Sequence, residues 1–244
     1  TSDLYGGARG GVLRQTWTNL RRSGLGFVNY LALSFLYYPW LLRAAQLLGA
    51  TRRRSVAQLC RRYAIPRLHS GDVNSPETRA RVRAAAPDFL VVYWFDQILD
   101  EESIALPRRA VVNVHAAILP RCRGLFPGLY SALENHVRGQ PFGISAHLIE
   151  SRAIDAGPVL AWRSATPQPG KSVLFLDAWL NRAGVDLVAE VLDDFERLKA
   201  EARPQGEGSY YSYPEREQLR ELKRQGRALV APREVWAVLR GVSR

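Results

Sequence analysis

Two apolar runs constrain the fold of this chain more than any other feature. They are DFLVVYWF at residues 88–95 and AVVNV at residues 110–114, both rich in β-branched and aromatic side chains, as is typical of strands covered on both faces. Before the first run, Ser75 and Pro76 predict the N-cap and first turn of a helix that continues to about Ala86. Strands and a helix joined by short connections predict an α/β fold with a mostly parallel sheet flanked by helices.

Further elements follow from the same two periodicities. Apolar residues at helical spacing predict helices, and short β-branched runs predict strands. We expect helices over residues 52–63, 128–135, 172–200, 215–225 and 233–240, and strands over residues 143–149 and 159–163. Residues 64–76 are expected to form a short strand followed by a turn.

The charge of the chain favours an anionic partner. The net charge of +11 at 244 residues comes almost wholly from arginine, which fits a phosphate, a nucleotide sugar, a nucleic acid or an acidic membrane. Codon usage in a GC-rich genome explains the arginines equally well. Cys60 and Cys122 show neither disulfide nor metal-ligand spacing, so we expect no metal site and a reducing compartment such as the cytoplasm. The chain lacks an initial Met and a signal peptide, and we expect it to begin inside a longer protein.

An apolar helical segment is expected over residues 23–49. Residues 23–42 carry no charge and are flanked by Arg21, Arg22 and Arg43; this length is just sufficient to span a bilayer. The Gly, Asn, Ser and Pro residues within it, and its many Tyr and Trp residues, favour a buried helix pair or a helix lying at a membrane interface. We expect a buried helix first, peripheral membrane contact second and a transmembrane span last.

Polar side chains follow the 110–114 strand. Asn113 and His115 are two residues apart, so in extended backbone they leave the same face of the sheet. Ligands of open α/β sheets bind outside the carboxyl ends of strands. Gly124 allows a close backbone approach to a ligand, and Asp155 precedes a Gly-Pro turn. These residues are the candidate site residues near the end of this strand.

The stretches NVHAAILPRCRG (113–124) and GISAHLIESRAIDAGPVL (143–160) resemble the 10-formyltetrahydrofolate-dependent formyltransferase family. That family shows Asn-x-His, a Leu-Pro-x-x-x-Gly turn, and then His followed by Asp-x-Gly-Pro, and the resemblance is clear over residues 88–163. It implies a Rossmann-like formyltransferase core in which Asn113, His115 and Asp155 are catalytic.

The resemblance also implies where the co-substrates bind. The 10-formyltetrahydrofolate donor is expected against two loops, with contacts from Asp96, Gln97, Ile98, Leu99, Glu150, Ser151 and Ile154. The acceptor amine is expected beside the turn that contains Arg121, Arg123, Gly124 and Phe126. The two arginines suit a substrate phosphate, although an ordinary exposed turn explains them equally well.

The remaining candidates stay open at this point. His147 lies inside a predicted strand and serves either the catalytic group or a core hydrogen bond, whereas His69 and His136 are expected in solvated loops. Cys122 is expected to be a passive thiol rather than a reactive one. By the resemblance, residues 1–200 form the catalytic domain, with its first strand absent or divergent, and residues 201–244 form a loop and short helices.

The turn GLFPGLYSALEN at residues 124–135 is most similar to N-formyltransferases that act on amino sugars linked to nucleotides, or on other biosynthetic amines. Enzymes acting on initiator methionyl-tRNA carry a further domain after this core, whereas here only residues 201–244 follow it. We therefore disfavour that subclass, and a nucleic-acid partner in general. A glycinamide-ribonucleotide-type enzyme and a 10-formyltetrahydrofolate hydrolase are the alternatives within the family. A catalytically inactive, basic protein that binds membrane or nucleic acid is the alternative from another class. The oligomeric state stays open, a homodimer included.

Overall fold

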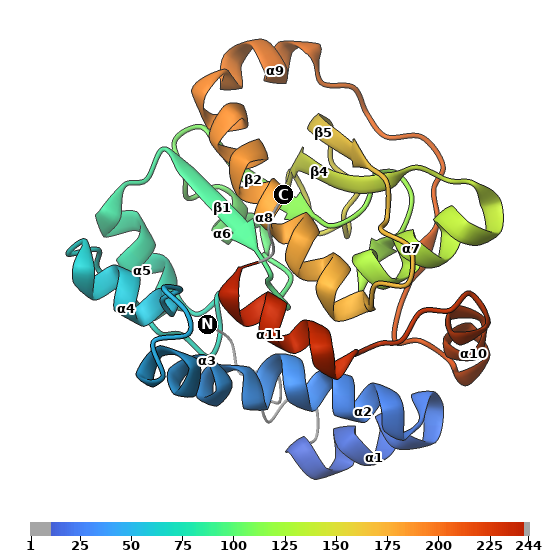
Figure 1. Cartoon of the computed structure of the whole chain (residues 1–244). Coiled ribbons are helices and arrows are strands. Elements are labelled where there is room, and N and C mark those ends of the chain that lie inside the picture. The colour runs from blue at the N-terminus through green and yellow to red at the C-terminus, as the bar shows by residue number, and fades with distance from the viewer. Residues whose placement is uncertain (1–10, 242–244) are drawn as a thin grey trace. The chain divides into compact units, whose positions relative to one another are not determined.

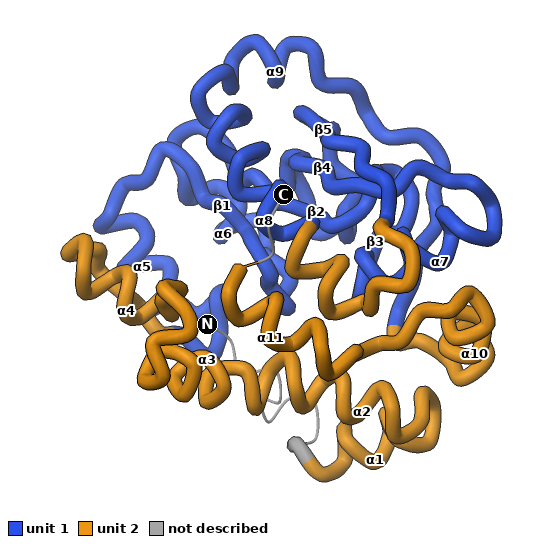
Figure 2. Tube along the Cα trace, viewed as in Figure 1, with its two compact units in different colours: residues 1–6, 70–167, 180–212 blue, residues 7–69, 168–179, 213–244 orange. Residues whose placement is uncertain are grey.

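The computed structural model describes residues 11–241, and the chain divides into two compact units. Within these residues, the first unit comprises 70–167 and 180–212, and the second comprises 11–69, 168–179 and 213–241 (Figure 2). The candidate catalytic group of Asn113, His115 and Asp155 lies wholly in the first unit. The predicted boundary at residue 200 stays a prediction.

A four-stranded sheet forms the centre of the first unit (Figure 1). Its order is β1-β2-β4-β5, with β1 at Phe89–Tyr93, β2 at Ala110–His115, β4 at Phe142–Leu148 and β5 at Val159–Ala165. The pair β1–β2 is parallel, whereas β2–β4 and β4–β5 are antiparallel. A short two-stranded sheet pairs β3 (Arg123–Gly124) with β6 (Tyr210–Tyr211) in parallel.

The predicted α/β class is confirmed, with a correction to the strand directions. The sheet is mixed rather than mostly parallel, because the chain enters β4 antiparallel to β2 and the connection from β4 to β5, which contains no helix, reverses it again. Parallel neighbours require a longer crossover. In addition, β1 is an edge strand of this sheet and Val91 is 41% exposed, so the expectation that this strand is covered on both faces is wrong.

Alternation along the strands separates a packing face from a site face. Val114 and Ile144 both pack closely against Gly184 of α8 (Val173–Asp193), where an added Cβ would lie within 3.0 Å of both side chains. The residues one position earlier on each strand, Asn113 and Gly143, face the other side of the sheet. The packing on α8 thereby fixes the side of the sheet on which Asn113 and His115 appear.

The other elements of the first unit are helices. The Ser75 hydroxyl accepts a hydrogen bond from the Thr78 N–H, which confirms the predicted N-cap. The predicted long helix is interrupted at Asp194, whose backbone leaves helical geometry (φ −116°, ψ 33°). The helices are α5 (Pro76–Ala85), α6 (Glu101–Ile104), α7 (Pro127–Arg138), the continuation of α8 and α9 (Phe195–Glu201).

The second unit is helical. Its core includes Leu42, Ala45 and Leu239, which are buried together. The short strand expected at the start of residues 64–76 is wrong, because this segment pairs with no strand among residues 11–241 and Ala64 adopts a left-handed backbone (φ 51°). The elements are α1 (Gly11–Ser23), α2 (Leu25–Leu31), a π-helical stretch η2 (Ala32–Tyr37), α3 (Tyr38–Leu47), α4 (Val56–Arg62), α10 (Arg216–Arg224), α11 (Pro232–Arg240) and the start of α8.

The apolar segment forms one continuous helical stretch from Leu25 to Leu47. Its 23 residues have the length and hydropathy of a helix that can cross a membrane, and 22% of its most apolar window is buried. Phe27, Tyr30 and Leu31 are buried, whereas Trp40 is 73% exposed. The segment is therefore amphipathic in its packing, with one face in the core of the unit.

Candidate active site

The site forms where β2 ends. Asn113 and His115 leave the same face of this strand, as their spacing predicts, and Asp155 reaches them from the loop between β4 and β5. The Asn113 side-chain nitrogen lies 3.1 Å from Asp155 Oδ1, and His115 Nδ1 lies 3.5 Å from the same oxygen. The structure thus brings together all three predicted catalytic residues.

Asp155 is held from two directions. Its second carboxylate oxygen, Oδ2, accepts a hydrogen bond of 2.8 Å from the backbone N–H of Gly124. Its own backbone is left-handed (φ 49°), a conformation that costs free energy in residues other than glycine. Gly124 also adopts a positive φ of 93°, and an added Cβ there would lie 2.2 Å from the Tyr211 carbonyl oxygen. Only glycine fits at this position.

His147 joins the group as a fourth member. Its Nε2 lies 2.9 Å from the Asn113 side-chain nitrogen and 3.4 Å from Asp155 Oδ1. A register shift between Ala146 and His147 in the pairing of β4 with β5 marks a local bulge, and such bulges re-aim side chains near functional sites. The structure shows both of the roles that the sequence left open for His147: contact with the catalytic group and a buried hydrogen bond, 2.8 Å from Nδ1 to the Leu148 carbonyl oxygen.

The tautomer of each histidine follows from its carbonyl partner. His115 Nε2 lies 2.8 Å from the Cys122 carbonyl oxygen, and His147 Nδ1 lies 2.8 Å from the Leu148 carbonyl oxygen. A carbonyl only accepts, so both nitrogens carry hydrogen. In the neutral rings, the lone pairs are therefore on His115 Nδ1, facing Asp155, and on His147 Nε2, facing the Asn113 amide.

Burial and charge set the protonation states. Burial lowers the pKa of His115 below its ordinary value, and this outweighs the attraction of Asp155. Burial alone would raise the pKa of Asp155, but attraction to His115 and the hydrogen bond from the Gly124 N–H lower it to about 2. At neutral pH the site therefore holds a carboxylate beside a neutral imidazole whose Nδ1 is ready to accept a proton.

The turn after β2 is cross-linked to the rest of the unit. Arg121 forms an ion pair of 2.8 Å with Glu134, and Arg123 donates to the Gln205 side-chain oxygen at 2.9 Å. Phe126 has a left-handed backbone (φ 54°) and precedes α7. The predicted acceptor contacts of this turn stay predictions. Burial raises the pKa of the Cys122 thiol to about 12, which agrees with a passive cysteine.

The predicted donor residues occupy two loops. After β1, the Gln97 side chain accepts from the Val73 N–H at 2.9 Å, and the Ile98 carbonyl accepts from the Asn74 side chain at 2.8 Å. Asp96 is half-buried and Leu99 buried in the same loop. Between β4 and β5, Glu150, Ser151 and Ile154 are exposed. The contacts that these residues make with a donor stay predictions.

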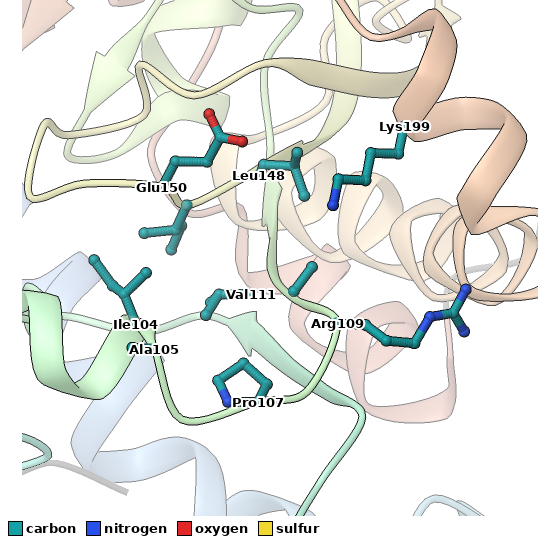
Figure 3. Close-up of a pocket in the computed structure, with 10 residues that line it drawn as sticks. Ile104, Ala105, Pro107, Arg109, Val111, Leu148, Glu150 and Lys199 are labelled. Carbon is teal, nitrogen blue, oxygen red and sulfur yellow. The ribbon is translucent and has the colours of Figure 1, made fainter.

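A cavity of about 260 Å³ lies beside this second loop. In Figure 3, Ile104 and Glu150 lie on one side of it and Arg109 and Lys199 on the other. Val111 also lines it and lies two residues before Asn113, on the same face of β2 and roughly 7 Å along the strand. Among the predicted donor residues, Glu150 lines the cavity.

Several contacts of the site escape sequence reasoning. Ile104, Val111 and Ile149 line the cavity but read as ordinary core residues in the sequence. Glu134 and Gln205 contact the turn after β2 from distant parts of the chain, with no motif to mark them. Among the described residues, no three His, Cys, Asp or Glu side chains are grouped so as to hold a metal ion.

Comparison with known proteins places this geometry in a family. Residues 42–191 match the family described as formyl transferase. A methionyl-tRNA formyltransferase from Trichlorobacter lovleyi is 30% identical over 157 residues, which are 64% of this chain and 48% of that protein. The chain spans about half the length of the curated relatives that it matches.

One solved structure shares this fold, and a second shows a weaker likeness. A variant of HypX from Aquifex aeolicus aligns with a TM-score of 0.51 at 23% identity, covering 61% of this chain and 26% of that one. A sugar N-formyltransferase from Shewanella sp FDAARGOS_354 aligns with a TM-score of 0.46 at 22% identity, covering 57% and 54%. The family match includes the whole of the Asn113, His115, His147 and Asp155 group. The chain therefore belongs to the formyl transferase family.

Proposed function

We propose that the protein is an N-formyltransferase that moves a formyl group from 10-formyltetrahydrofolate to a primary amine. The amine nitrogen forms a bond to the formyl carbon, the bond from that carbon to the folate nitrogen breaks, and one proton passes from the amine to the folate nitrogen. The observation that carries this proposal is the convergence of the Asn113 amide and His115 Nδ1 on one carboxylate oxygen of Asp155.

Each residue has a role in this reaction. The tetrahedral intermediate carries a negative oxygen, which a preorganised amide donor such as that of Asn113 stabilises. His115 Nδ1 accepts the proton of the attacking amine and returns it to the leaving nitrogen. Asp155 stabilises the imidazolium that forms between these two steps, because it lies 3.5 Å from His115 Nδ1 and is ionised at neutral pH.

The cavity beside Glu150 suits part of the donor. Ligand sites begin at about 300 Å³, so a volume of about 260 Å³ accommodates one ring system rather than the whole molecule. Apolar side chains from Ile104 and Val111 provide the walls and the Glu150 carboxylate provides an acceptor for ring N–H groups. We place the pterin ring of the donor here, two residues along β2 from Asn113.

The proposal also concerns which amine accepts the formyl group. The net charge of +11 and the neighbouring Arg121 and Arg123 support a phosphorylated or nucleotide-linked amine, with an amino-sugar nucleotide as our first choice. Initiator methionyl-tRNA is the second candidate, supported by the methionyl-tRNA formyltransferases among the relatives. Glycinamide ribonucleotide, and water in a hydrolase, are the further alternatives within the family.

Turnover with defined acceptors tests the proposal. The protein is incubated with 10-formyltetrahydrofolate and, separately, with amino-sugar nucleotides, glycinamide ribonucleotide, charged initiator tRNA or no acceptor. We expect tetrahydrofolate and a formylated amine to appear together with at least one amino-sugar nucleotide. Formate released at the same rate with and without amines would replace the transferase with a hydrolase, and the absence of any donor turnover would refute both.

The second unit supports an additional membrane contact. Leu25, Leu36, Trp40 and Leu47 are 58–80% exposed and recur at intervals of 11, 4 and 7 residues, which places them on one side of the helical stretch. Arg21, Arg22 and Arg43 are exposed beside them. We propose that this face binds the cytoplasmic surface of an anionic membrane. Equal sedimentation with anionic and neutral vesicles, unchanged in Trp40→Glu, would refute this contact.

A further inference from the structure

The segment 203–212 lies outside the matched family region, yet it contacts both loops that carry the catalytic group. Arg203 pairs with Val159 through an antiparallel bridge. At its other end, Tyr210–Tyr211 pairs with Arg123–Gly124. Gly208 packs so closely on Pro120 that an added Cβ would lie 1.8 Å from the Pro120 carbonyl oxygen. The segment is thereby fixed against the site along its whole length.

Gln205 joins the two loops directly. Its side-chain nitrogen donates to the Asp155 carbonyl oxygen at 3.0 Å and to the Gly157 carbonyl oxygen at 2.6 Å. Its side-chain oxygen accepts from the Arg123 guanidinium at 3.2 and 2.9 Å. Each end of one amide group thus binds a different loop.

These hydrogen bonds control the position of the Asp155 carboxylate within the catalytic group. Gly124, the residue after Arg123, donates its N–H to Asp155 Oδ2 at 2.8 Å. Gln205 donates to the Asp155 carbonyl oxygen and accepts from the side chain of Arg123, which directly precedes Gly124. Moving either loop therefore alters the Asp155 carboxylate, and with it the 3.5 Å separation from His115 Nδ1.

A second set of contacts holds the Cys122 carbonyl oxygen, which accepts a hydrogen bond from His115. Ser209 accepts from the Cys122 N–H at 2.9 Å and donates to Glu134 at 3.0 Å, and Cys122 presents its carbonyl oxygen to His115 Nε2. Glu134 is 3% exposed and also accepts from Tyr211. The segment therefore fixes both His115 and Asp155 through backbone atoms of the loops that surround them.

We propose that Gln205 is a positioning residue for the transfer reaction, which holds the Asp155 loop against the Arg123–Gly124 turn. This inference rests on the proposed function. The donation from the Gln205 amide to the Asp155 and Gly157 carbonyls is the essential part, because it orients the loop that carries the carboxylate. A misplacement of about 1 Å in a catalytic group costs on the order of a hundredfold in rate.

Two substitutions test the contacts that the Gln205 amide donates and the contact that it accepts. Gln205→Ala removes both kinds of contact. Gln205→Glu keeps an acceptor for Arg123 and replaces the donor with a carboxylate that the two carbonyls repel. Glu207→Ala, an exposed residue of the same segment, is the matched control. We measure kcat, the KM for 10-formyltetrahydrofolate and the midpoint of thermal unfolding for each protein.

We expect kcat to fall about 10- to 100-fold in Gln205→Ala and Gln205→Glu, with the donor KM and the unfolding midpoint close to those of the Glu207→Ala control. A wild-type kcat in both variants would overturn the proposal. So would a wild-type kcat in Gln205→Glu alone, since the contact with Arg123 would then suffice. A fall in kcat that is matched by a large loss of thermal stability would assign Gln205 a structural role only.

A second measurement can be made without an acceptor amine. The ring signal of His115 in a histidine-labelled protein, assigned by its loss in His115→Gln, reports the surroundings of the catalytic group by NMR. We expect this signal to shift in Gln205→Ala and to stay in place in Glu207→Ala. If the wild type transfers no formyl group, the proposed function fails but this shift still supports positioning. An unchanged His115 signal in Gln205→Ala would overturn the positioning role whatever the activity.

Discussion

Asn113 donates from its side-chain amide to Nε2 of His147 at 2.9 Å. This contact fixes the direction of the amide, because His147 Nδ1 carries hydrogen and its Nε2 is left as an acceptor. The same amide nitrogen lies 3.1 Å from Asp155 Oδ1. The Asn113 amide is thus already oriented, by one buried histidine and one carboxylate, before a substrate binds, and one of its two N–H groups must leave its present partner to reach the oxyanion.

Substitution of His147 tests this orientation. His147→Leu removes the acceptor and leaves the Asn113 amide free to rotate, so we expect kcat to fall about 10- to 100-fold with the donor KM little changed. His147→Gln restores an acceptor oxygen and should recover part of the rate. Steady-state kinetics of the two variants provide the measurement. A His147→Leu protein as active as the wild type would show that the contact does not matter for catalysis.

Acid should weaken the fold through the catalytic group. The pKa of Asp155 falls from 3.8 to about 2 in the folded chain, so its carboxylate contributes stability above pH 3.8 that is lost as the pH falls toward 2, roughly 2 kcal/mol in all. The lowered pKa of His115 acts in the same direction, with stability lost as the pH falls below 6.5.

Urea unfolding across this pH range measures the effect. We expect Asp155→Asn to be less stable than the wild type at pH 7, by an amount that shrinks between pH 4 and pH 2. The exposed Asp193→Asn substitution is the control and should follow the wild type. A constant gap between Asp155→Asn and the wild type down to pH 2 would contradict the ionised, buried carboxylate.

Asp177 should show the opposite dependence. Burial raises the pKa of this residue to about 7, although a hydrogen bond of 2.7 Å from the Tyr30 hydroxyl opposes the shift. A raised pKa means that stability is present below pH 3.8 and is lost as the pH rises through 7. Asp177→Asn keeps an acceptor for Tyr30 without the charge.

We therefore expect Asp177→Asn to stabilise the protein by roughly 2 to 4 kcal/mol at pH 8, and by less as the pH falls to 5. Chemical denaturation at the two pH values tests this, with Asp193→Asn again as the control. If Asp177→Asn is destabilising at pH 8, the carboxylate is needed for a contact that an amide cannot replace.

Packing of α8 on the sheet gives a further prediction. A Cβ added at Gly184 would lie 2.5 Å from the Tyr93 hydroxyl, 2.7 Å from Ile144 and 2.9 Å from Val114. Gly184→Ala should cost about 1–3 kcal/mol of unfolding free energy through overpacking. Gly71→Ala, where nothing lies within 4 Å, is the matched control. Equal unfolding midpoints for the two variants would mean that α8 moves away from the sheet without cost.

Local patterns predicted the parts of the structure that depend on neighbouring residues. The alternation of Val112 to His115 placed Asn113 and His115 on one face, and Ser75 with Pro76 placed the start of α5, because both depend on residues a few positions apart. The resemblance added Asp155, which the structure places within 3.5 Å of the other two.

Features that depend on distant residues escaped the sequence analysis. The sequence predicts a strand at the start of residues 64–76, but this segment pairs with no strand in the described part of the chain, so local composition gives the wrong answer there. The direction of β4 depends on how the chain returns after α7, which no local pattern records. Gln205 and Glu134 contact the catalytic turn from 82 and 13 residues away, and neither carries a recognisable signal.

The most direct test of the account compares His115→Ala with the wild type in the transfer of a formyl group from 10-formyltetrahydrofolate to an amino-sugar nucleotide, followed by mass spectrometry of the formylated product. His115 Nδ1 is the basic atom that faces Asp155, so its removal should lower turnover about 100-fold or more while donor binding, measured by calorimetry with tetrahydrofolate, stays within about threefold of the wild-type value. Formylated product at the wild-type rate in His115→Ala would contradict the proposed mechanism.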